Sequence, residues 1–237
     1  MKLSFRWYGS SDPVKLEYIK QIPTMHSIVT AIYDVPVGQV WEMDKILNLK
    51  NEVEKAGLKF EVIESVPVHE DIKLGLPSRD IYIENYKKNI ENLAKAGVKV
   101  ICYNFMPVFD WTRSQLDKQL EDGSTALVYY KDQVDKLDPL NSELSLPGWD
   151  SSYTKEEMAQ LFEKYKELGE EGLWKNLEYF LKEIIPVAEI NDMKMAIHPD
   201  DPPWPIFGLP RIITNESNLD RFLNLVAVSY THLTLPT

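Results

Sequence analysis

Residues 60–103 read FEVIESVPVHEDIKLGLPSRDIYIENYKKNIENLAKAGVKVICY, and this stretch decides the fold class. Its first part, residues 60–66, and its last part, residues 98–103, are short runs rich in β-branched and aromatic side chains, which favour β-strands. Between them, residues 79–96 carry apolar side chains at helical spacing, and Gly97 stands where a helix-terminating glycine is expected. The stretch therefore predicts a strand, a helix and a second strand in succession.

The same alternation continues on both sides of this unit. Further strands are expected at residues 3–7, 28–33, 194–198 and 211–214, and further helices at residues 13–21 and 41–56. Strands that alternate with helices in this way form a parallel sheet, which is either open or closed into a barrel. The chain is therefore expected to be an α/β protein with about six parallel strands.

The alternation is interrupted between residues 104 and 192, where the connection between two strands is much longer than usual. Residues 111–149 are expected to be polar and irregular. Two helices should follow, the first opened by a capping box at Thr154–Glu157 and ended near Gly169, the second covering about Glu171–Ala188. Because this insertion leaves the carboxyl end of a strand, we interpret it either as a substrate lid or as a peripheral dimerisation element.

The amino-acid composition limits the kinds of partner that the protein is expected to bind. The chain has 237 residues, 44% of them hydrophobic, and a formal net charge of -11, which disfavours binding to nucleic acid or to an anionic membrane. No apolar stretch approaches the roughly 18 residues that span a bilayer, so a cytoplasmic location is expected. Cys102 is the only cysteine, which excludes an internal disulfide. A small anionic substrate would need a local cation, either a metal ion or a buried arginine.

Polar side chains gather where the expected strands end. A histidine by itself is more often a structural residue than a ligand, but His198 comes directly after a strand, and four prolines within residues 199–205 stiffen the loop that follows it. In a barrel such strand ends converge on one face, which carries the active site in barrel enzymes. The candidate site residues at these ends are Arg6, Trp7, His69, Asn104, His198, Asp200 and Asp201.

Four strings around these residues resemble one family, the mannonate dehydratases. They are FRWYG at residues 5–9, VPVHEDIK at residues 66–73, YNFMPVFDWTR at residues 103–113 and IHPDDPPWP at residues 197–205. The resemblance runs from Met1 to about Val226. It implies a xylose-isomerase-like (β/α) barrel of the TIM type.

The family resemblance also implies a reaction. The expected reaction is the dehydration of D-mannonate to 2-keto-3-deoxy-D-gluconate in hexuronate (glucuronate) catabolism. The reaction is expected to depend on a divalent metal, with Mn²⁺ as the first choice and Fe²⁺ as the alternative. By similarity His198 is a metal ligand, and the family's other ligands, a Cys, a His and an Asp, lie on later strands. The resemblance further suggests that Arg6, Trp7 and Asn104 bind the substrate and that His69 is a catalytic residue of the same pocket. Asp200 and Asp201, which follow His198 directly, are candidates for proton transfer or for orienting His198.

The last part of the chain departs from the family pattern. A helix capped by Ser217 should lead to a seventh strand, but residues 227–237 lack the expected motif and are interpreted as a non-native tail. Residues 1–226 would then form an incomplete barrel, inactive and prone to aggregate when expressed alone. The complete protein is expected to be a homo-oligomer. Two alternatives stay open: another metal-dependent barrel isomerase or lyase acting on sugars or sugar acids, and a binding module without catalysis.

Overall fold

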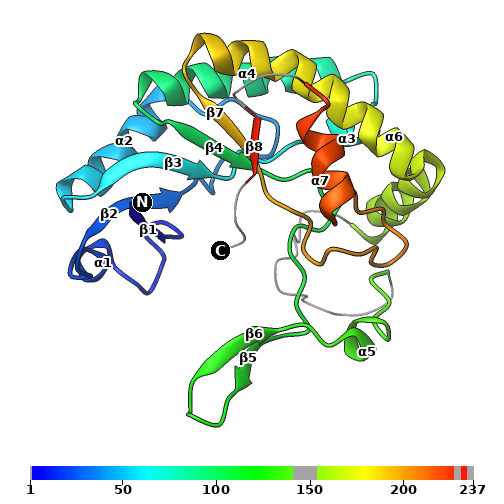
Figure 1. Cartoon of the computed structure of the whole chain (residues 1–237), viewed down its shortest axis with the longest axis horizontal. Helices are drawn as coiled ribbons and strands as arrows, with labels where there is room; N and C mark the ends of the chain where they lie inside the picture. The colour runs from blue at the N-terminus through cyan, green and yellow to red at the C-terminus, as the bar shows by residue number, and fades with distance from the viewer. Residues whose placement is uncertain (1, 141–153, 227–230, 234–237) are drawn as a thin grey trace.

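The computed structural model describes residues 2–140, 154–226 and 231–233. Six parallel strands form one curved sheet within these residues (Figure 1). Their order across the sheet follows the chain: β1 (Leu3–Arg6), β2 (Met25–Thr30), β3 (Lys59–Glu64), β4 (Val100–Tyr103), β7 (Lys194–Ile197) and β8 (Thr231–Leu233). All neighbouring pairs in this sheet are parallel, which confirms the α/β class.

Helices connect these strands and cover one side of the sheet. Figure 1 shows α2, α4 and α6 along its outer, convex face. The helices are α1 (Leu16–Lys20), α2 (Met43–Lys55), α3 (Glu70–Leu74), α4 (Arg79–Lys95), α5 (Lys131–Val134), α6 (Lys155–Ile190) and α7 (Glu216–Leu223). A parallel sheet whose strands follow chain order, with helices outside, is the arrangement of a (β/α) barrel. None of the helices in the described parts of the chain has the length and apolarity needed to cross a membrane.

Helix α4 buries the apolar stripe that its sequence predicts. Ile83, Ile90 and Leu93 are at most 1% exposed and belong to the main core. The helix also holds the loop before α2 by polar contacts. Asn89 accepts a hydrogen bond from the Trp41 backbone N–H at 2.6 Å and donates one to the Gln39 carbonyl at 3.1 Å. The first contact satisfies a buried backbone N–H that no strand or helix partner satisfies.

The long helix α6 begins as its sequence predicts. Thr154 accepts a hydrogen bond from the Glu157 backbone N–H, and the Glu157 carboxylate accepts one from the Thr154 backbone N–H, so the capping box is confirmed. Gly169 takes a left-handed φ of 63° and separates two helical parts, as expected. The second part packs Leu177, Phe180 and other apolar side chains into the main core.

Residues 111–149 contain more regular structure than expected. Strands β5 (Gln115–Gln119) and β6 (Thr125–Val128) form an antiparallel hairpin, and α5 follows, so the expectation of an irregular segment is wrong for the described residues. Figure 1 shows the hairpin extending away from the barrel. The polar composition misled the prediction, because a two-stranded ribbon outside the core does not need an apolar face. Residues 141–149 lie outside the described residues.

Three boundaries also differ from the sequence prediction. Strand β2 begins and ends three residues before the expected range of 28–33, because its apolar continuation, Ala31–Tyr33, passes beyond the paired part of β1 and β3. Residues 211–214 form no strand, although residues 211–213 are buried, since the Asp200 carboxylate accepts hydrogen bonds from Ile212 and Ile213 where a neighbouring strand would otherwise pair. Asn215, not Ser217, caps α7.

The expected non-native tail contributes β8, which pairs with β7 in parallel. Through this pairing β8 becomes the sixth strand of the sheet. The origin of residues 227–237 stays a prediction.

We predict that Asn89→Ala lowers the free energy of unfolding by about 1–3 kcal/mol, because the buried Trp41 N–H would lose its partner. Lys88→Ala on the exposed side of the same helix is the control, with an expected change of at most about 1 kcal/mol. Urea denaturation measures both. Equal losses for the two variants would contradict the role assigned to Asn89.

Candidate active site

A cavity of about 130 Å³ opens at the carboxyl ends of the strands. Arg6 ends β1, Glu64 ends β3, Tyr103 ends β4, and His198 follows β7. The cavity is lined by Arg6, Tyr8, Glu64, Ser65, Tyr103, Asn104, Asp110, Trp111, Arg113, Leu127, His198 and Asp201. In (β/α) barrels this end of the sheet carries the active site. Four of the residues singled out from the sequence, Arg6, Asn104, His198 and Asp201, meet here.

His198 is held with one ring nitrogen available. Its backbone N–H donates to the Tyr103 carbonyl at 2.7 Å, which continues the β4–β7 ladder. Its Nδ1 lies 2.6 Å from the Pro199 carbonyl oxygen. Because a carbonyl only accepts, Nδ1 is the donor of this contact, and in the neutral form of the ring Nε2 presents its lone pair. This is the tautomer that a metal ligand needs.

The rest of a metal site is not found around His198. Within residues 2–140, 154–226 and 231–233, no group of three or more His, Cys, Asp or Glu side chains is placed to hold an ion. The described residues therefore supply one suitable ligand and do not form a metal centre by themselves.

Arg6 makes a weaker contact with a carboxylate than Arg113, the other arginine that lines the cavity. Its Nη1 lies 3.4 Å from a Glu64 carboxylate oxygen, but this atom is buried without a hydrogen bond in the described structure. The guanidinium also lies 5.0 Å from the centre of the Tyr8 ring, a distance typical of a cation–π contact. Arg6 thus keeps donors that can bind a carboxylate entering the cavity.

Arg113 and Asp201 close one side of the cavity. Two hydrogen bonds of 2.7 Å join the Arg113 guanidinium to both oxygens of the Asp201 carboxylate. This paired geometry is the strong form of an arginine–carboxylate contact, and it ties the loop after β4 to the loop after β7. Asp201, expected to take part in proton transfer, is therefore engaged as the partner of Arg113.

Asp110 lies in the cavity although the sequence prediction did not include it. Its side chain is open to the cavity, and no hydrogen bond or ion pair engages its carboxylate among the described residues. Desolvation raises the pKa of Asp110, and the charge of a protonated His198 acts in the opposite direction. The string that carried the family resemblance at residues 103–113 already contained Asp110 and Arg113. Glu64 was detectable as the polar last residue of a strand.

His69, expected at the substrate pocket, does not line this cavity in the described structure. Its Nδ1 accepts a hydrogen bond from the Asp71 backbone N–H, so it caps α3. Its ring stacks on Tyr82 with the ring centres 3.6 Å apart, outside the cavity described above. Burial lowers the pKa of His69, against the opposing effect of Asp71 and Glu70. The residue is a helix cap and a packing residue.

Trp7 and Asp200 are also placed differently from the expectation. Trp7 is 2% exposed and packs in the main core, since the pleat of β1 directs it away from the face on which Arg6 lies. Asp200 is 4% exposed, and one of its oxygens accepts hydrogen bonds from the Ile212 and Ile213 N–H groups at 2.7 and 3.1 Å. Asp200 therefore orders the loop after β7 instead of facing the substrate.

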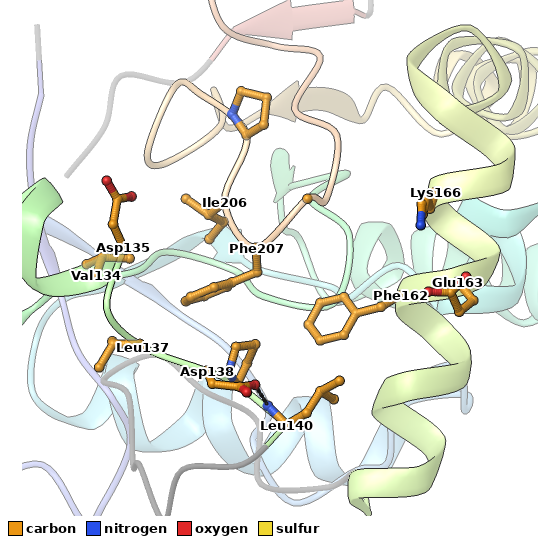
Figure 2. Close-up of a pocket in the computed structure, with 13 residues that line it drawn as sticks. Val134, Asp135, Leu137, Asp138, Leu140, Phe162, Glu163, Lys166, Ile206 and Phe207 are labelled. Carbon is orange, nitrogen blue, oxygen red and sulfur yellow. Dashed lines mark hydrogen bonds between the residues drawn. The ribbon is translucent and has the colours of Figure 1, made fainter.

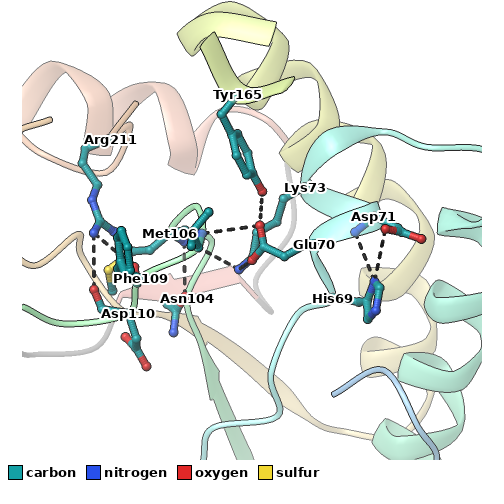
Figure 3. A network of polar contacts seen from close by, with 11 residues as sticks. His69, Glu70, Asp71, Lys73, Asn104, Met106, Phe109, Asp110, Tyr165 and Arg211 are labelled. Carbon is teal, nitrogen blue, oxygen red and sulfur yellow. Dashed lines mark hydrogen bonds and ion pairs between the residues drawn. The ribbon is translucent and has the colours of Figure 1, made fainter. Parts of the chain in front are cut away.

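A buried polar network anchors the loop after β4, which carries Asn104 and Asp110 (Figure 3). The Lys73 ammonium donates to the Glu70 carboxylate at 2.7 Å and to the Met106 carbonyl at 2.8 Å. The second Glu70 oxygen accepts a hydrogen bond from the Tyr165 hydroxyl. Helices α3 and α6 are thus connected to the backbone of the loop at the base of the cavity.

A larger hollow of about 620 Å³ lies between α5, α6 and residues 205–208 (Figure 2). Apolar side chains such as Phe162, Ile206 and Phe207 form much of its wall. None of the residues expected to bind substrate or metal lines it. Convergence of strand-end groups, not size, therefore identifies the smaller cavity as the candidate active site.

Fold and cavity together define the class: a (β/α)-barrel protein with a polar cavity at the carboxyl ends of its strands, lined by two arginines and a histidine. The model of the D-mannonate dehydratase (UxuA) family matches residues 1–237. The chain is 62% identical over 225 residues to mannonate dehydratase 2 of Halalkalibacterium halodurans. This protein belongs to the D-mannonate dehydratase family.

Solved structures agree with this assignment. The crystal structure of mannonate dehydratase from Streptococcus suis superimposes with a TM-score of 0.89 and 56% identity, covering 99% of this chain and 63% of that one. D-psicose 3-epimerase from Clostridium cellulolyticum has a TM-score of 0.54 at 12% identity, covers 98% of this chain and 62% of its own, and shows the fold alone. The match to the Halalkalibacterium halodurans protein covers 95% of this chain and 65% of that relative, so the chain spans about two thirds of the relative's length.

We predict that Tyr165→Phe lowers the free energy of unfolding by about 1.5–3 kcal/mol, because a buried carboxylate loses a hydrogen bond. Tyr179→Phe is the matched control: it lies on the same helix and donates to the Asp80 carboxylate at 2.9 Å, but at an exposed site. Its expected cost is at most about 1 kcal/mol. Urea denaturation of both variants would contradict the anchoring role of Tyr165 if the two costs were the same.

Proposed function

We propose that the full-length protein dehydrates D-mannonate to 2-keto-3-deoxy-D-gluconate, a step of hexuronate breakdown. The observation that carries the proposal is the meeting of Arg6 and His198 in one cavity at the strand ends of a chain that belongs to this family. Arg6 supplies charge for the sugar acid's carboxylate, and its unused donors suit a bidentate contact. The chain's overall negative charge makes such a local cation necessary.

Asn104 is suited to bind a hydroxyl group of the substrate. Its Oδ1 accepts a hydrogen bond from the Met106 backbone N–H at 3.2 Å, which fixes the side chain and assigns the amide orientation. The Nδ2 group then remains as a donor at the cavity. A hydroxylated acid presents acceptors of the matching kind.

The proposed enzyme uses a divalent metal, with Mn²⁺ as the first candidate and Fe²⁺ as the alternative. His198 would be one ligand through Nε2, and the ligands that complete the site would come from outside the described residues. A bound ion would stabilise the negative charge that develops on the substrate's carboxylate and adjacent hydroxyl when the C2 proton leaves. Arg6 and Asn104 hold the substrate in place for this step.

The test is an assay of the full-length protein with D-mannonate and added Mn²⁺ or Fe²⁺. Product identification by NMR should give 2-keto-3-deoxy-D-gluconate. An isomerised or epimerised acid of unchanged composition would identify the protein instead as an isomerase of the same barrel class. Binding of mannonate without any product would identify it as a binding module.

Arg6→Lys should raise the KM for mannonate about 10- to 100-fold while changing kcat much less. Lysine keeps the charge but loses the paired N–H donors, and a charge-assisted hydrogen bond contributes about 1.5–3 kcal/mol. Arg221→Lys, which alters a surface pair with Glu171, is the control and should leave KM unchanged. An unchanged KM in Arg6→Lys would remove Arg6 from the substrate site.

His198→Ala should abolish metal retention together with activity in the full-length protein, because the site loses an imidazole ligand. His69→Ala should retain the metal of the wild type, since its ring packs on Tyr82 away from the cavity. Elemental analysis of the purified proteins gives the metal content. Wild-type metal content in His198→Ala would show that His198 is not a ligand.

A further inference from the structure

We propose that Asp110 is the general acid that protonates the departing C3 hydroxyl of the sugar acid, an inference that rests on the proposed dehydration. Three carboxylates line the cavity within the described part of the chain: Glu64, Asp110 and Asp201. Glu64 lies 3.4 Å from Arg6, and Asp201 makes the paired contact with Arg113. Among the described residues no hydrogen bond or ion pair engages the Asp110 carboxylate, so of the three it is the most available for exchanging a proton with a ligand.

The backbone around Asp110 is fixed although its side chain is not engaged. The buried Arg211 guanidinium donates to the carbonyl oxygens of Phe109 and Asp110 at 3.1 and 3.3 Å. Lys73 holds the Met106 carbonyl of the same loop. In Figure 3 the Asp110 carboxyl group points away from the Arg211 guanidinium. A side chain on a fixed backbone, without a competing partner, is preorganised for a reacting group.

The direction of the pKa shift at Asp110 is the one that a general acid needs. Desolvation raises its pKa, and the positive groups that oppose this are His198, Lys73, Arg211 and Arg6. A carboxyl group whose pKa is raised toward the working pH is a more effective proton donor at that pH. Geometry selects Asp110 among the three carboxylates, and desolvation agrees with that choice.

The proposed step removes water from a 2,3-dihydroxy acid. The proton on C2 passes to a second basic side chain of the full-length site, and the C2–H electron pair forms the C2–C3 double bond. The C3–O bond breaks, its electrons stay on oxygen, and that oxygen takes the proton of Asp110 and leaves as water. The enol then tautomerises to the 2-keto acid, and solvent returns a proton to the Asp110 carboxylate.

The test compares two substrates in the full-length protein loaded with metal. Asp110→Asn should lower kcat for D-mannonate about 10²- to 10⁴-fold, the usual contribution of a general acid. With 3-deoxy-3-fluoro-D-mannonate the loss should be at most about tenfold, since fluoride leaves with little need for a proton. Asp117→Asn, exposed on the hairpin, is the matched control and should behave as wild type with both substrates.

A second variant tests whether the loss of activity is caused by misfolding. Asp110→Glu keeps a carboxyl group and should recover part of the mannonate activity and the acid-dependent limb of the pH profile, and thermal melting should match wild type for both variants. Unchanged turnover of mannonate by Asp110→Asn would overturn the proposal. So would equal losses with the hydroxyl and fluoro substrates. A wild-type protein inactive on mannonate would instead refute the proposed function, which separates the two failures.

Discussion

The buried pair of Glu70 and Lys73 is the contact on which the geometry of the site depends. Both side chains are less than 10% exposed, so both charges lose most of their hydration. Such a pair is tolerable only when further hydrogen bonds satisfy the remaining donors and acceptors, and here Tyr165 and the Met106 carbonyl provide them. The partners come from α3, α6 and the loop after β4. Removal of one member would leave a buried charge unpaired, and for this reason the three segments hold one another in a single arrangement.

The central strand imposes a second constraint. Strand β4 pairs in parallel with β3 on one side and β7 on the other, so the ends of all three lie at one edge of the sheet. Tyr103 is the last residue of β4, and its carbonyl accepts the hydrogen bond of the His198 N–H beyond the end of β7. The register of the sheet thus brings His198 beside the loop that carries Asn104, and no contact between the side chains is needed to achieve it.

The parts that could be predicted from sequence follow from local periodicity. The stripe of α4, the capping box at Thr154 and the break at Gly169 depend on residues within a few positions of one another, and all three are found as expected. The convergence of Arg6, Asn104 and His198 followed from their positions at strand ends. His69, Trp7 and Asp200 were assigned to the site by the same argument but lie elsewhere. For Trp7 the alternation of side chains along the strand was not applied, whereas His69 depends on stacking with Tyr82 and Asp200 on backbone N–H groups twelve or more residues away, which local pattern does not encode.

The pairing of charges in the cavity decides which groups remain available for chemistry. A chain with a net charge of -11 must concentrate cations locally to attract an acid, and Arg6, Arg113 and His198 line the cavity while Lys73 and Arg211 lie behind it. Arg113 is neutralised by Asp201, and Arg211 is used to hold backbone carbonyls. Arg6 shares a looser contact with Glu64 and keeps a buried donor atom without a hydrogen bond. Among the described residues the distribution therefore leaves one guanidinium, one imidazole nitrogen and one carboxyl group available at the cavity, and the proposed elimination of water from a sugar acid would use these groups for the carboxylate, the metal and the proton.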